Sequence, residues 1–274
     1  MLRDRLLARL AEMGDAPDHQ RLAVEVLGIR GAPPELARRL VAQALVLEDR
    51  REVWRAAGER ICREAPGTPG VYVLKDTEGR ALYVGKAVNL RRRLRAHFAD
   101  RRWRALKPGL SRAADAEWRE VGSELEALLR EAALIQERRP PVNVQTGAPD
   151  LHARDVPGAL MRDVLVVLPS VEADSVELTG ARLNGAWMIQ RTRRNGADLG
   201  VHARRLMKFF RTAPPAAARQ TAPFAPLVFS WLAGRGAMAT RLDPHDVRSA
   251  RELQARLSAL LVDERLFVER LDQR

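Results

Sequence analysis

The chain has 274 residues, of which 46% are hydrophobic, so it suits one large or two to three small folded domains. Its formal net charge of +12 indicates a polyanionic partner, with nucleic acid as the first candidate. The single cysteine excludes an internal disulfide bond and a cysteine-rich zinc cluster. Since no apolar run approaches membrane-spanning length and residues 1–14 are too charged for a secretory signal, we expect a cytoplasmic protein with no membrane partner.

Residues 1–64 have the pattern of an all-helical domain. Apolar residues recur at helical spacing in residues 2–13, 20–28, 34–48 and 50–62. Proline near the first turn, in GAPPEL, marks the start of the third of these segments. A helix-turn-helix-like arrangement is one option for this domain, but the pattern alone does not indicate that it reads DNA.

Residues 65–146 change character and mix strand and helix signals. The stretch GTPGVYVLKDTEGRALYVGK has two β-rich runs around a polar turn with glycine, which predicts a hairpin. A basic helix with the sequence NLRRRLRAHF follows, and we expect a second helix at 101–113 and a short strand at 116–121. ELEALLREAALI predicts a last helix from residue 124, which the prolines of RRPPVNV end.

Both tyrosines of the chain, Tyr72 and Tyr83, lie in this hairpin. If the turn closes over residues 77–78, Tyr72 lies opposite Tyr83 and Gly70 opposite Gly85, so both rings project from one face. One interpretation is that the pair only stabilises the hairpin. The other is a phosphate site, because glycine in a strand often marks the close approach of a ligand or another backbone, and cations follow directly in the sequence.

The basic helix opens the densest positive window of the chain, with nine basic residues and one acid from residue 86 to residue 107. Leu90, Leu94 and Phe98 define its buried face, which Arg93 and His97 flank, so we expect these two to be functional. The other basic residues are expected to contact nucleic-acid phosphates or to be solvated: Arg91, Arg92, Arg95, Arg101, Arg102, Arg104 and Lys107.

Glu131 is at odds with the pattern of its helix. It lies four residues before Ile135 and so points towards the apolar face, where an ionised carboxylate is costly unless a cation meets it. That cation is either a buried arginine or a divalent metal ion, and one carboxylate with water and substrate phosphate is a magnesium-type ligand set. Glu126 needs no such role, because with Ser123 it forms a capping box that starts the helix.

Residues 147–211 are predicted to form a second α+β region, with the strand-like runs DVLVVLP, DSVELTG and AWMIQRT before the helix ADLGVHARRLMKFF. A Pro/Ala-rich linker is predicted at 212–226 and a C-terminal helical segment at 227–274. Several arginines of this half either extend a nucleic-acid track or are simply solvated: Arg191, Arg193, Arg194, Arg204 and Arg205.

The motifs of residues 65–146 resemble the GIY-YIG nuclease family, and among its members the N-terminal domain of the bacterial excinuclease UvrC and its shorter Cho-type homologues. GVY, YVG, the lysine that follows, arginine and histidine on the next helix, and EALLREAALIQERRPPVN occur in the family's order. The resemblance implies an α+β fold, with a small three-stranded antiparallel sheet and flanking helices. In this chain an all-helical domain would precede that fold and a second α+β region would follow it.

Carried over residue by residue, the resemblance assigns catalytic roles to Tyr72, Tyr83, Lys86, Arg93, His97 and Glu131. It makes Glu131 the ligand of Mg²⁺ or Mn²⁺, and it makes Asn143 the asparagine that closes the domain. His97 stands where many excinucleases have tyrosine, so the general base stays open between Tyr83, Tyr72 and His97. Our first hypothesis is that Tyr83 deprotonates water, with Lys86 lowering its pKa, and that Arg93 meets the charge that develops on the phosphate.

The implied function is that of a metal-dependent endonuclease that nicks DNA, either structure-specific or of the nucleotide-excision-repair type. Duplex, damaged or branched DNA and other repair proteins are the implied partners. A nucleic-acid-binding protein that no longer cuts and a basic helical regulator are the alternatives. Residues 150–274 match neither the second nuclease domain nor the helix-hairpin-helix elements of the UvrC excinucleases, so a full dual-incision enzyme is not expected.

Overall fold

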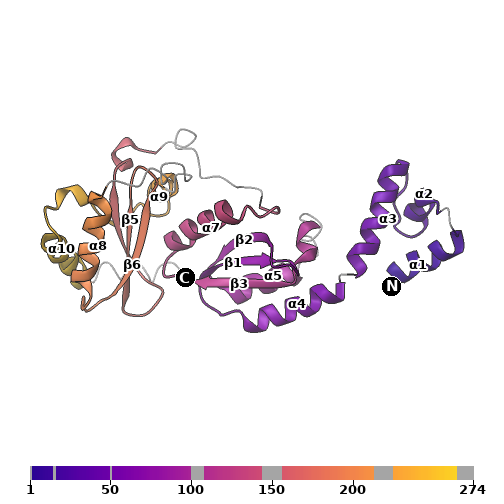
Figure 1. The fold of residues 1–274 in the computed structure, drawn as a ribbon, viewed down its shortest axis with the longest axis horizontal. Helices are drawn as coiled ribbons and strands as arrows, with labels where there is room; N and C mark the ends of the chain where they lie inside the picture. Colours follow the sequence, from indigo (N-terminus) through magenta and orange to yellow (C-terminus); the bar gives the residue numbers. More distant parts are fainter. Residues whose placement is uncertain are drawn as a thin grey trace.

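The computed structural model describes residues 2–14, 17–49, 51–99, 108–143, 156–212 and 225–263. These residues form three consecutive groups, which are a set of N-terminal helices, a small sheet with helices and a second sheet with helices (Figure 1). Within these ranges, no helix combines the length and the apolar character that a membrane crossing requires.

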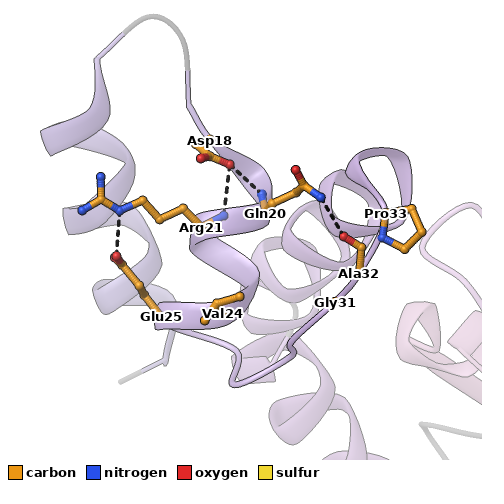
Figure 2. Close-up of a pocket in the computed structure, with 8 residues that line it drawn as sticks. All are labelled: Asp18, Gln20, Arg21, Val24, Glu25, Gly31, Ala32 and Pro33. Atoms are coloured by element: carbon orange, nitrogen blue, oxygen red, sulfur yellow. Dashed lines mark hydrogen bonds and ion pairs between the residues drawn. The ribbon is translucent and has the colours of Figure 1, made fainter.

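The N-terminal helices lie where the apolar spacing predicts them: α1 (Leu2–Met13), α2 (His19–Glu25), α3 (Pro34–Asp49) and α4 (Arg51–Glu64). The first three pack around Leu6, Leu22 and Val41. Figure 2 shows how the α2 start is fixed, since Asp18 accepts from two backbone amides and the Gln20 side chain donates to the Ala32 carbonyl at 2.9 Å. The hollow beside them measures about 590 Å³, and no candidate catalytic residue lines it.

The first sheet confirms the predicted α+β class for the middle of the chain. Its strands are β1 (Gly70–Lys75), β2 (Ala81–Ala87) and β3 (Asp115–Glu120), all antiparallel, in the order β2-β1-β3. On one face, α4 and α5 (Leu90–Ala99) pack on a core that includes Tyr72, Leu74, Leu90 and Leu94. The helix α7 (Glu124–Arg138) covers the opposite face.

The hairpin register differs from the predicted one by two residues. Tyr72 lies opposite Gly85 and not opposite Tyr83, which pairs with Leu74. The cause is a longer turn with a bulge at its start, held by the buried Asp76 carboxylate, which accepts from the backbone amides of Glu78 and Arg80 at 3.0 Å. Because side chains alternate with a period of two, a shift of two residues keeps both tyrosines on the predicted common face.

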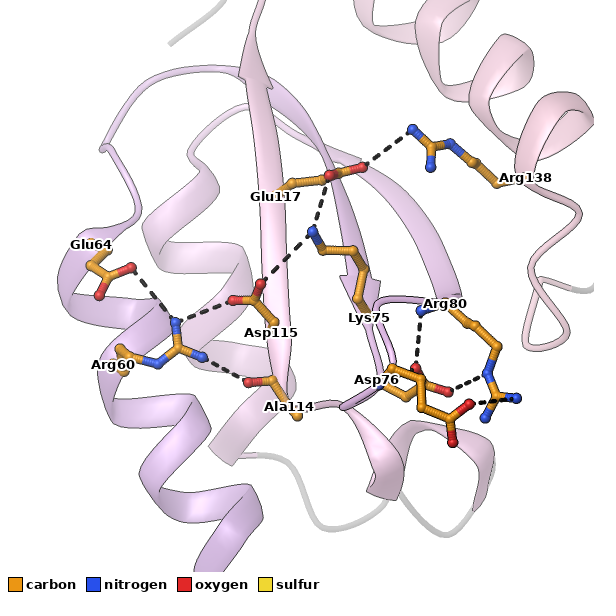
Figure 3. A network of polar contacts seen from close by, with 10 residues as sticks. Arg60, Glu64, Lys75, Asp76, Arg80, Ala114, Asp115, Glu117 and Arg138 are labelled. Carbon is orange, nitrogen blue, oxygen red and sulfur yellow. Dashed lines mark hydrogen bonds and ion pairs between the residues drawn. The ribbon is translucent and has the colours of Figure 1, made fainter.

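Polar contacts tie the far edge of the first sheet to its neighbours (Figure 3). Arg60 of α4 donates to the Ala114 carbonyl at 2.7 Å and lies 3.1 Å from the Asp115 carboxylate. Lys75 of β1 lies between Asp115 and Glu117 of β3, at 3.7 and 3.1 Å. Charges of the two signs alternate here, so this edge is not a strongly positive surface.

The second sheet has four strands in the order β6-β5-β4-β7: β4 (Val164–Pro169), β5 (Ser175–Ala181), β6 (Trp187–Arg193) and β7 (Thr240–Leu242). Two helices, α8 (Leu199–Arg211) and α10 (Ala250–Val262), cover one face. On the other face lie α7, which belongs to the first sheet as well, and α9 (Ala225–Leu232) (Figure 1). Short 3₁₀ turns complete the described elements at Pro108–Arg112, Gly158–Leu160 and Pro244–Asp246.

Sequence patterns did not predict all of this second region. The strand β7 lies inside the segment predicted to be helical, and it pairs with β4, about seventy-five positions earlier in the chain. The predicted linker at 212–226 overlaps the start of α9, and its residues 213–224 lie outside the described part of the chain. In the first sheet region, the same holds for residues 101–107 of the predicted helix at 101–113.

The helix α7 is buried on two faces, because it packs against both sheets. Leu125 and Leu129 contribute to a core with Val164, Val166 and Phe229 of the second sheet region. Ala127, Leu134 and Ile135 pack against Val71, Val73 and Val84 of the first sheet. The two sets of apolar positions explain why a single stripe cannot account for all the apolar residues of this helix.

A buried polar network joins the start of α7 to the second sheet. Glu126 is 1% exposed and accepts from the Gly122 amide, from Arg130 and from Arg191 of β6. The Ser123 hydroxyl donates to Glu177 of β5 at 2.5 Å. The predicted capping bond between Ser123 and the Glu126 amide is present at 3.0 Å, but the Glu126 carboxylate turns to Gly122 and to Arg191.

The network holds its two carboxylates in different states. Burial raises the pKa of Glu177 to about 7, and the charge of Glu126 contributes. Burial has the same effect on Glu126, but the Gly122 amide and the Arg130 guanidinium outweigh it, so the pKa of Glu126 falls below its usual value. One ionised and one partly protonated carboxylate therefore share Arg191.

A substitution of Leu129 tests the packing of α7 against the second sheet region. Leu129→Ala is expected to lower the free energy of unfolding by about 2–5 kcal/mol, because Leu129 is fully buried and its removal leaves a cavity. The measurement is urea unfolding followed by circular dichroism. Leu183→Ala, at a side chain that is 50% exposed, is the control and is expected to change the free energy of unfolding little. Equal stabilities of the two variants would contradict the packing of Leu129 in the core of the second sheet region.

The pH dependence of stability tests the network. The folded protein holds the Glu177 proton up to about pH 7, while an ordinary glutamate releases it near 4.5. The native state therefore binds more protons in this window, so this group's contribution to the free energy of unfolding falls as pH rises from about 4.5 to 7 and is constant above. Relative to wild type, Glu177→Gln should gain stability between pH 5 and pH 8, on the order of 1–3 kcal/mol.

Thermal and urea unfolding at both pH values measure this difference. Glu172→Gln, at an exposed acid before the same strand, is the control for a change of charge alone. Parallel pH curves for wild type and Glu177→Gln would show that Glu177 is not the titrating group.

Candidate functional site

Four of the predicted site residues form one cluster on the α5 face of the first sheet. The Tyr72 ring centroid lies 6.1 Å from that of Tyr83 and 5.6 Å from that of His97, and Tyr83 and His97 are 6.0 Å apart. The Tyr72 hydroxyl and the His97 Nε2 atom share a hydrogen bond. Arg93, one turn before His97, hydrogen-bonds to both phenols.

The helix α5 places His97 differently from the prediction. His97 was expected beside the buried stripe, but it is 3% exposed and belongs to the buried face with Leu90 and Leu94. The reason is that the helix lies directly over the two tyrosine rings, so the histidine at the third position after Leu94 also meets the sheet. Tyr72 is fully buried, whereas Tyr83 stays partly exposed.

The two strand glycines make room for the chain's own atoms. A Cβ atom on Gly85 would lie 2.6 Å from the Tyr72 hydroxyl oxygen and 2.9 Å from the Tyr83 ring. At Gly70 it would lie 2.5 Å from Leu90 and 2.6 Å from the Arg119 carbonyl oxygen. The expectation of an open backbone for a ligand is therefore wrong at both positions, and the close approach is internal.

Glu131 meets a lysine and not the arginine that one interpretation expected. Its carboxylate lies 3.3 Å from the Lys86 ammonium, and the two side chains are 22% and 30% exposed. Lys86 pairs with Val71 across the hairpin, which places it on the α7 face of β2, opposite the tyrosines. Because β2 is the edge strand, the glutamate on one side and the tyrosines on the other can both face the space beside it.

The pKa values of the two phenols show that Glu131, on the α7 face of the sheet, acts electrostatically on the tyrosines of the α5 face. Burial is the largest cause that raises the pKa of Tyr72 and of Tyr83 above the usual value, and the charge of Glu131 raises both further. Arg93 opposes these effects by its charge and its hydrogen bonds. The expectation that Lys86 lowers the pKa of Tyr83 is therefore wrong, because Lys86 is paired with Glu131 and the cation at the phenols is Arg93.

The donor set fits a hard divalent cation bound by few protein ligands. Glu131 offers one partly exposed carboxylate, and no group of three or more His, Cys, Asp or Glu side chains gathers in the part of the chain that the structure describes. Mg²⁺ often binds to one or two carboxylates and keeps several waters, so one partly exposed carboxylate meets its needs. An ammonium already lies beside this carboxylate, which shows that its surroundings accept a positive charge.

Asn143 lies against β2 and pairs with its backbone. Its side-chain oxygen accepts from the Val84 amide and its nitrogen donates to the Val84 carbonyl, both at 2.9 Å. The Val142 amide also donates to the Leu82 carbonyl, at 3.1 Å. The segment after α7 thus pairs with β2 and holds the strand that carries Tyr83 and Lys86.

The expected phosphate contacts of the basic helix divide into three groups. Arg92 and Arg95 are exposed, as predicted. Arg91 is half-buried and donates to the Ala65 carbonyl at 2.7 Å, so it does not simply point outward. The remaining predicted contacts lie outside the described residues: Arg101, Arg102, Arg104 and Lys107.

Residues 68–144 match the family of the UvrC-like GIY-YIG domain, and this range contains every residue of the cluster described above. These residues are a UvrC-like GIY-YIG domain. The sequence resemblance to this nuclease family is thereby confirmed for about a quarter of the chain.

Relatives of this GIY-YIG domain are UvrABC system C proteins. The protein from Syntrophus aciditrophicus is 49% identical over 81 residues, which is 29% of this chain and 13% of the relative. The protein from Thermobifida fusca is 46% identical over 84 residues, 29% of this chain and 12% of the relative. The chain therefore spans only about an eighth of the length of these relatives.

Solved structures similar to the chain include the GIY-YIG N-terminal endonuclease domain of UvrC from Thermotoga maritima, bound to its catalytic divalent cation, magnesium. It is 34% identical and covers 32% of this chain and 96% of that one, with a TM-score of 0.29. A point mutant of the same domain, also bound to its catalytic divalent cation, is 33% identical with the same TM-score of 0.29.

The close packing at Gly85 gives a test of the site's architecture. Gly85→Ala is expected to lower the free energy of unfolding by about 1–3 kcal/mol, because the added methyl group meets the Tyr72 ring and hydroxyl. Urea unfolding followed by tryptophan fluorescence measures it. Gly158→Ala, where nothing lies within 4 Å of the added carbon, is the control. If both variants are as stable as wild type, Tyr72 does not pack on Gly85.

Proposed function

We propose that the chain is a metal-dependent endonuclease that hydrolyses DNA phosphodiester bonds, as a structure-specific or nucleotide-excision-repair-type nicking enzyme. The observation that carries this proposal is the convergence of Glu131 with Lys86 and of two tyrosines with Arg93 beside one edge strand. The relatives of the domain are named as UvrABC system C proteins, and the net charge of +12 suits a polyanionic substrate.

Glu131 is the residue that would hold Mg²⁺ or Mn²⁺. When bound, such an ion supplies Lewis-acid polarisation of a phosphoryl oxygen and can lower the pKa of a bound water. Lys86 then keeps its place beside the carboxylate and adds positive charge where the phosphate arrives. Arg93 supports the negative charge that develops on the phosphate, since it is the cation at the phenols.

Exposure distinguishes the three candidate general bases. Tyr72 and His97 are 0% and 3% exposed and are hydrogen-bonded to each other, so neither reaches a water in the substrate space directly. Tyr83 is partly exposed, and its phenolate form can accept a proton from such a water. Tyr72 and His97 then orient Tyr83, and Arg93 favours its ionised form against burial and the charge of Glu131.

Substrate DNA would approach beside α5. Arg92 and Arg95 are exposed on this helix, next to the residues of the cluster, and suit sequence-independent phosphate contacts. Other repair proteins remain expected partners, and the cytoplasm the expected location.

Glu131→Gln tests the proposal directly. The variant is expected to bind DNA as wild type does, but to nick it at least about a hundredfold more slowly, since a loss of several kcal/mol of charge stabilisation costs a factor of ten per 1.36 kcal/mol. The measurement is incubation of the purified chain with end-labelled duplex, nicked, flapped and branched DNA, in Mg²⁺, in Mn²⁺ and in chelator. Glu137→Gln, at an exposed acid on the same helix, is the matched control.

Two outcomes would refute the proposal. Nicking by Glu131→Gln at the wild-type rate would remove the metal role of the glutamate. Binding without metal-dependent cleavage by the wild-type chain, across the whole panel of substrates, would favour a DNA-binding protein that no longer cuts.

A further inference from the structure

The helix α8 carries positive charge without any acidic residue. Its sequence, LGVHARRLMKFFR, contains four basic residues, and residues 187–212 around it contain seven basic residues and one acid. The other side of this helix is fully explained by packing, because Ala203, Leu206, Met207 and Phe210 belong to the core on the second sheet.

The cations of α8 gather on its outer side. Arg204, Arg205 and Lys208 are all exposed, and Val201, at the same helical spacing, is 41% exposed. Positions three and four apart lie side by side on a helix, so these three cations form one stripe. Like charges at this spacing repel one another and destabilise a helix. The packing of α8 on the sheet does not require these charges.

Acidic partners do not neutralise this stripe. Among the residues that the structure describes, no ion pair joins Arg204, Arg205 or Lys208 to an acid. The helices α1 and α10 behave differently, since Arg9 of α1 pairs with Glu25, and Arg256 of α10 pairs with Glu252 at 3.0 Å. The stripe on α8 is therefore a positive surface and not half of an ion-pair network.

The stripe is separate from the candidate catalytic site. The helices α8 and α10 cover one face of the second sheet, whereas α7, which carries Glu131, packs on the other face (Figure 1). A phosphate bound at α8 cannot also be the phosphate at Glu131, because the second sheet lies between them.

We propose that Arg204, Arg205 and Lys208 form a nucleic-acid contact surface that holds DNA through its phosphates, apart from the point of cleavage. This inference rests on the proposal that DNA is the substrate. Lys208 lies about one helical turn after the consecutive residues Arg204 and Arg205, and no acid is paired to any of the three in the described residues. Together they present a point charge and two guanidinium forks to the phosphates without reading bases. The second sheet region then supplies affinity, and the GIY-YIG domain supplies chemistry.

The triple variant Arg204→Gln, Arg205→Gln and Lys208→Gln tests the surface in the full chain. With duplex DNA in chelator, its affinity at low salt is expected to fall at least about tenfold, and the slope of log K against log salt should shrink by about 0.9 for each lost contact. With Mg²⁺, the KM for nicking should rise while kcat stays unchanged, because no catalytic residue is altered.

The control has the same type of change on a helix of mixed charge. Arg55→Gln with Arg63→Gln removes exposed cations from α4, where Glu59 and Glu64 alternate with them, so it should leave affinity and salt slope nearly unchanged. An unchanged salt slope in the triple variant would overturn the proposal, as would a fall in kcat with an unchanged KM. Absence of nicking by the wild-type chain would instead count against the proposed function, and the binding measurement in chelator would still decide the role of α8.

Discussion

The structure depends on one helix that two sheets hold at the same time. Val71, Val73 and Val84 of the first sheet pack on one side of α7, and Val164, Val166 and Phe229 pack on the other. Glu131 lies in the middle of this helix, beside Lys86 of β2. The backbone that carries its carboxylate therefore has little freedom to move, because moving the helix disturbs two cores at once. A candidate ligand set built on this carboxylate needs such a support, since no group of three or more His, Cys, Asp or Glu side chains gathers among the described residues.

The polar network at the start of α7 adds directional contacts to this apolar packing. Van der Waals packing lets a helix slide or rotate slightly at low cost, whereas the contacts of Glu126 with Gly122 and Arg191 are directional. The Val171 amide also donates to the Gly122 carbonyl at 2.7 Å, so backbone as well as side chains join the two regions. A Cβ atom at Gly122 would lie 2.6 Å from Arg191, which explains glycine at the turn where the second sheet meets the helix.

Local patterns in the sequence predicted most of the site and little of its surroundings. The tyrosine face and the cap at Ser123 depend on spacing within a few residues, and both are present in the structure. The hairpin register was wrong because the Asp76 turn and its bulge depend on hydrogen bonds that spacing does not reveal. Glu126 was assigned only a capping role because its partner Arg191 lies sixty-five positions later, and no local pattern links the two.

In the proposal, the second sheet region separates two tasks that a single basic surface would combine. In the proposal, the groups that meet the reacting phosphate must be fixed in place, and Tyr72 and His97, which are almost inaccessible, hold Tyr83 from behind. A residue that only holds DNA gains nothing from such rigidity, and long exposed side chains on α8 adapt to phosphates in many positions. In the proposal, the two faces of the second sheet therefore do different work. The face towards α7 fixes the metal ligand, and the helices on the other face carry the charge that retains the substrate.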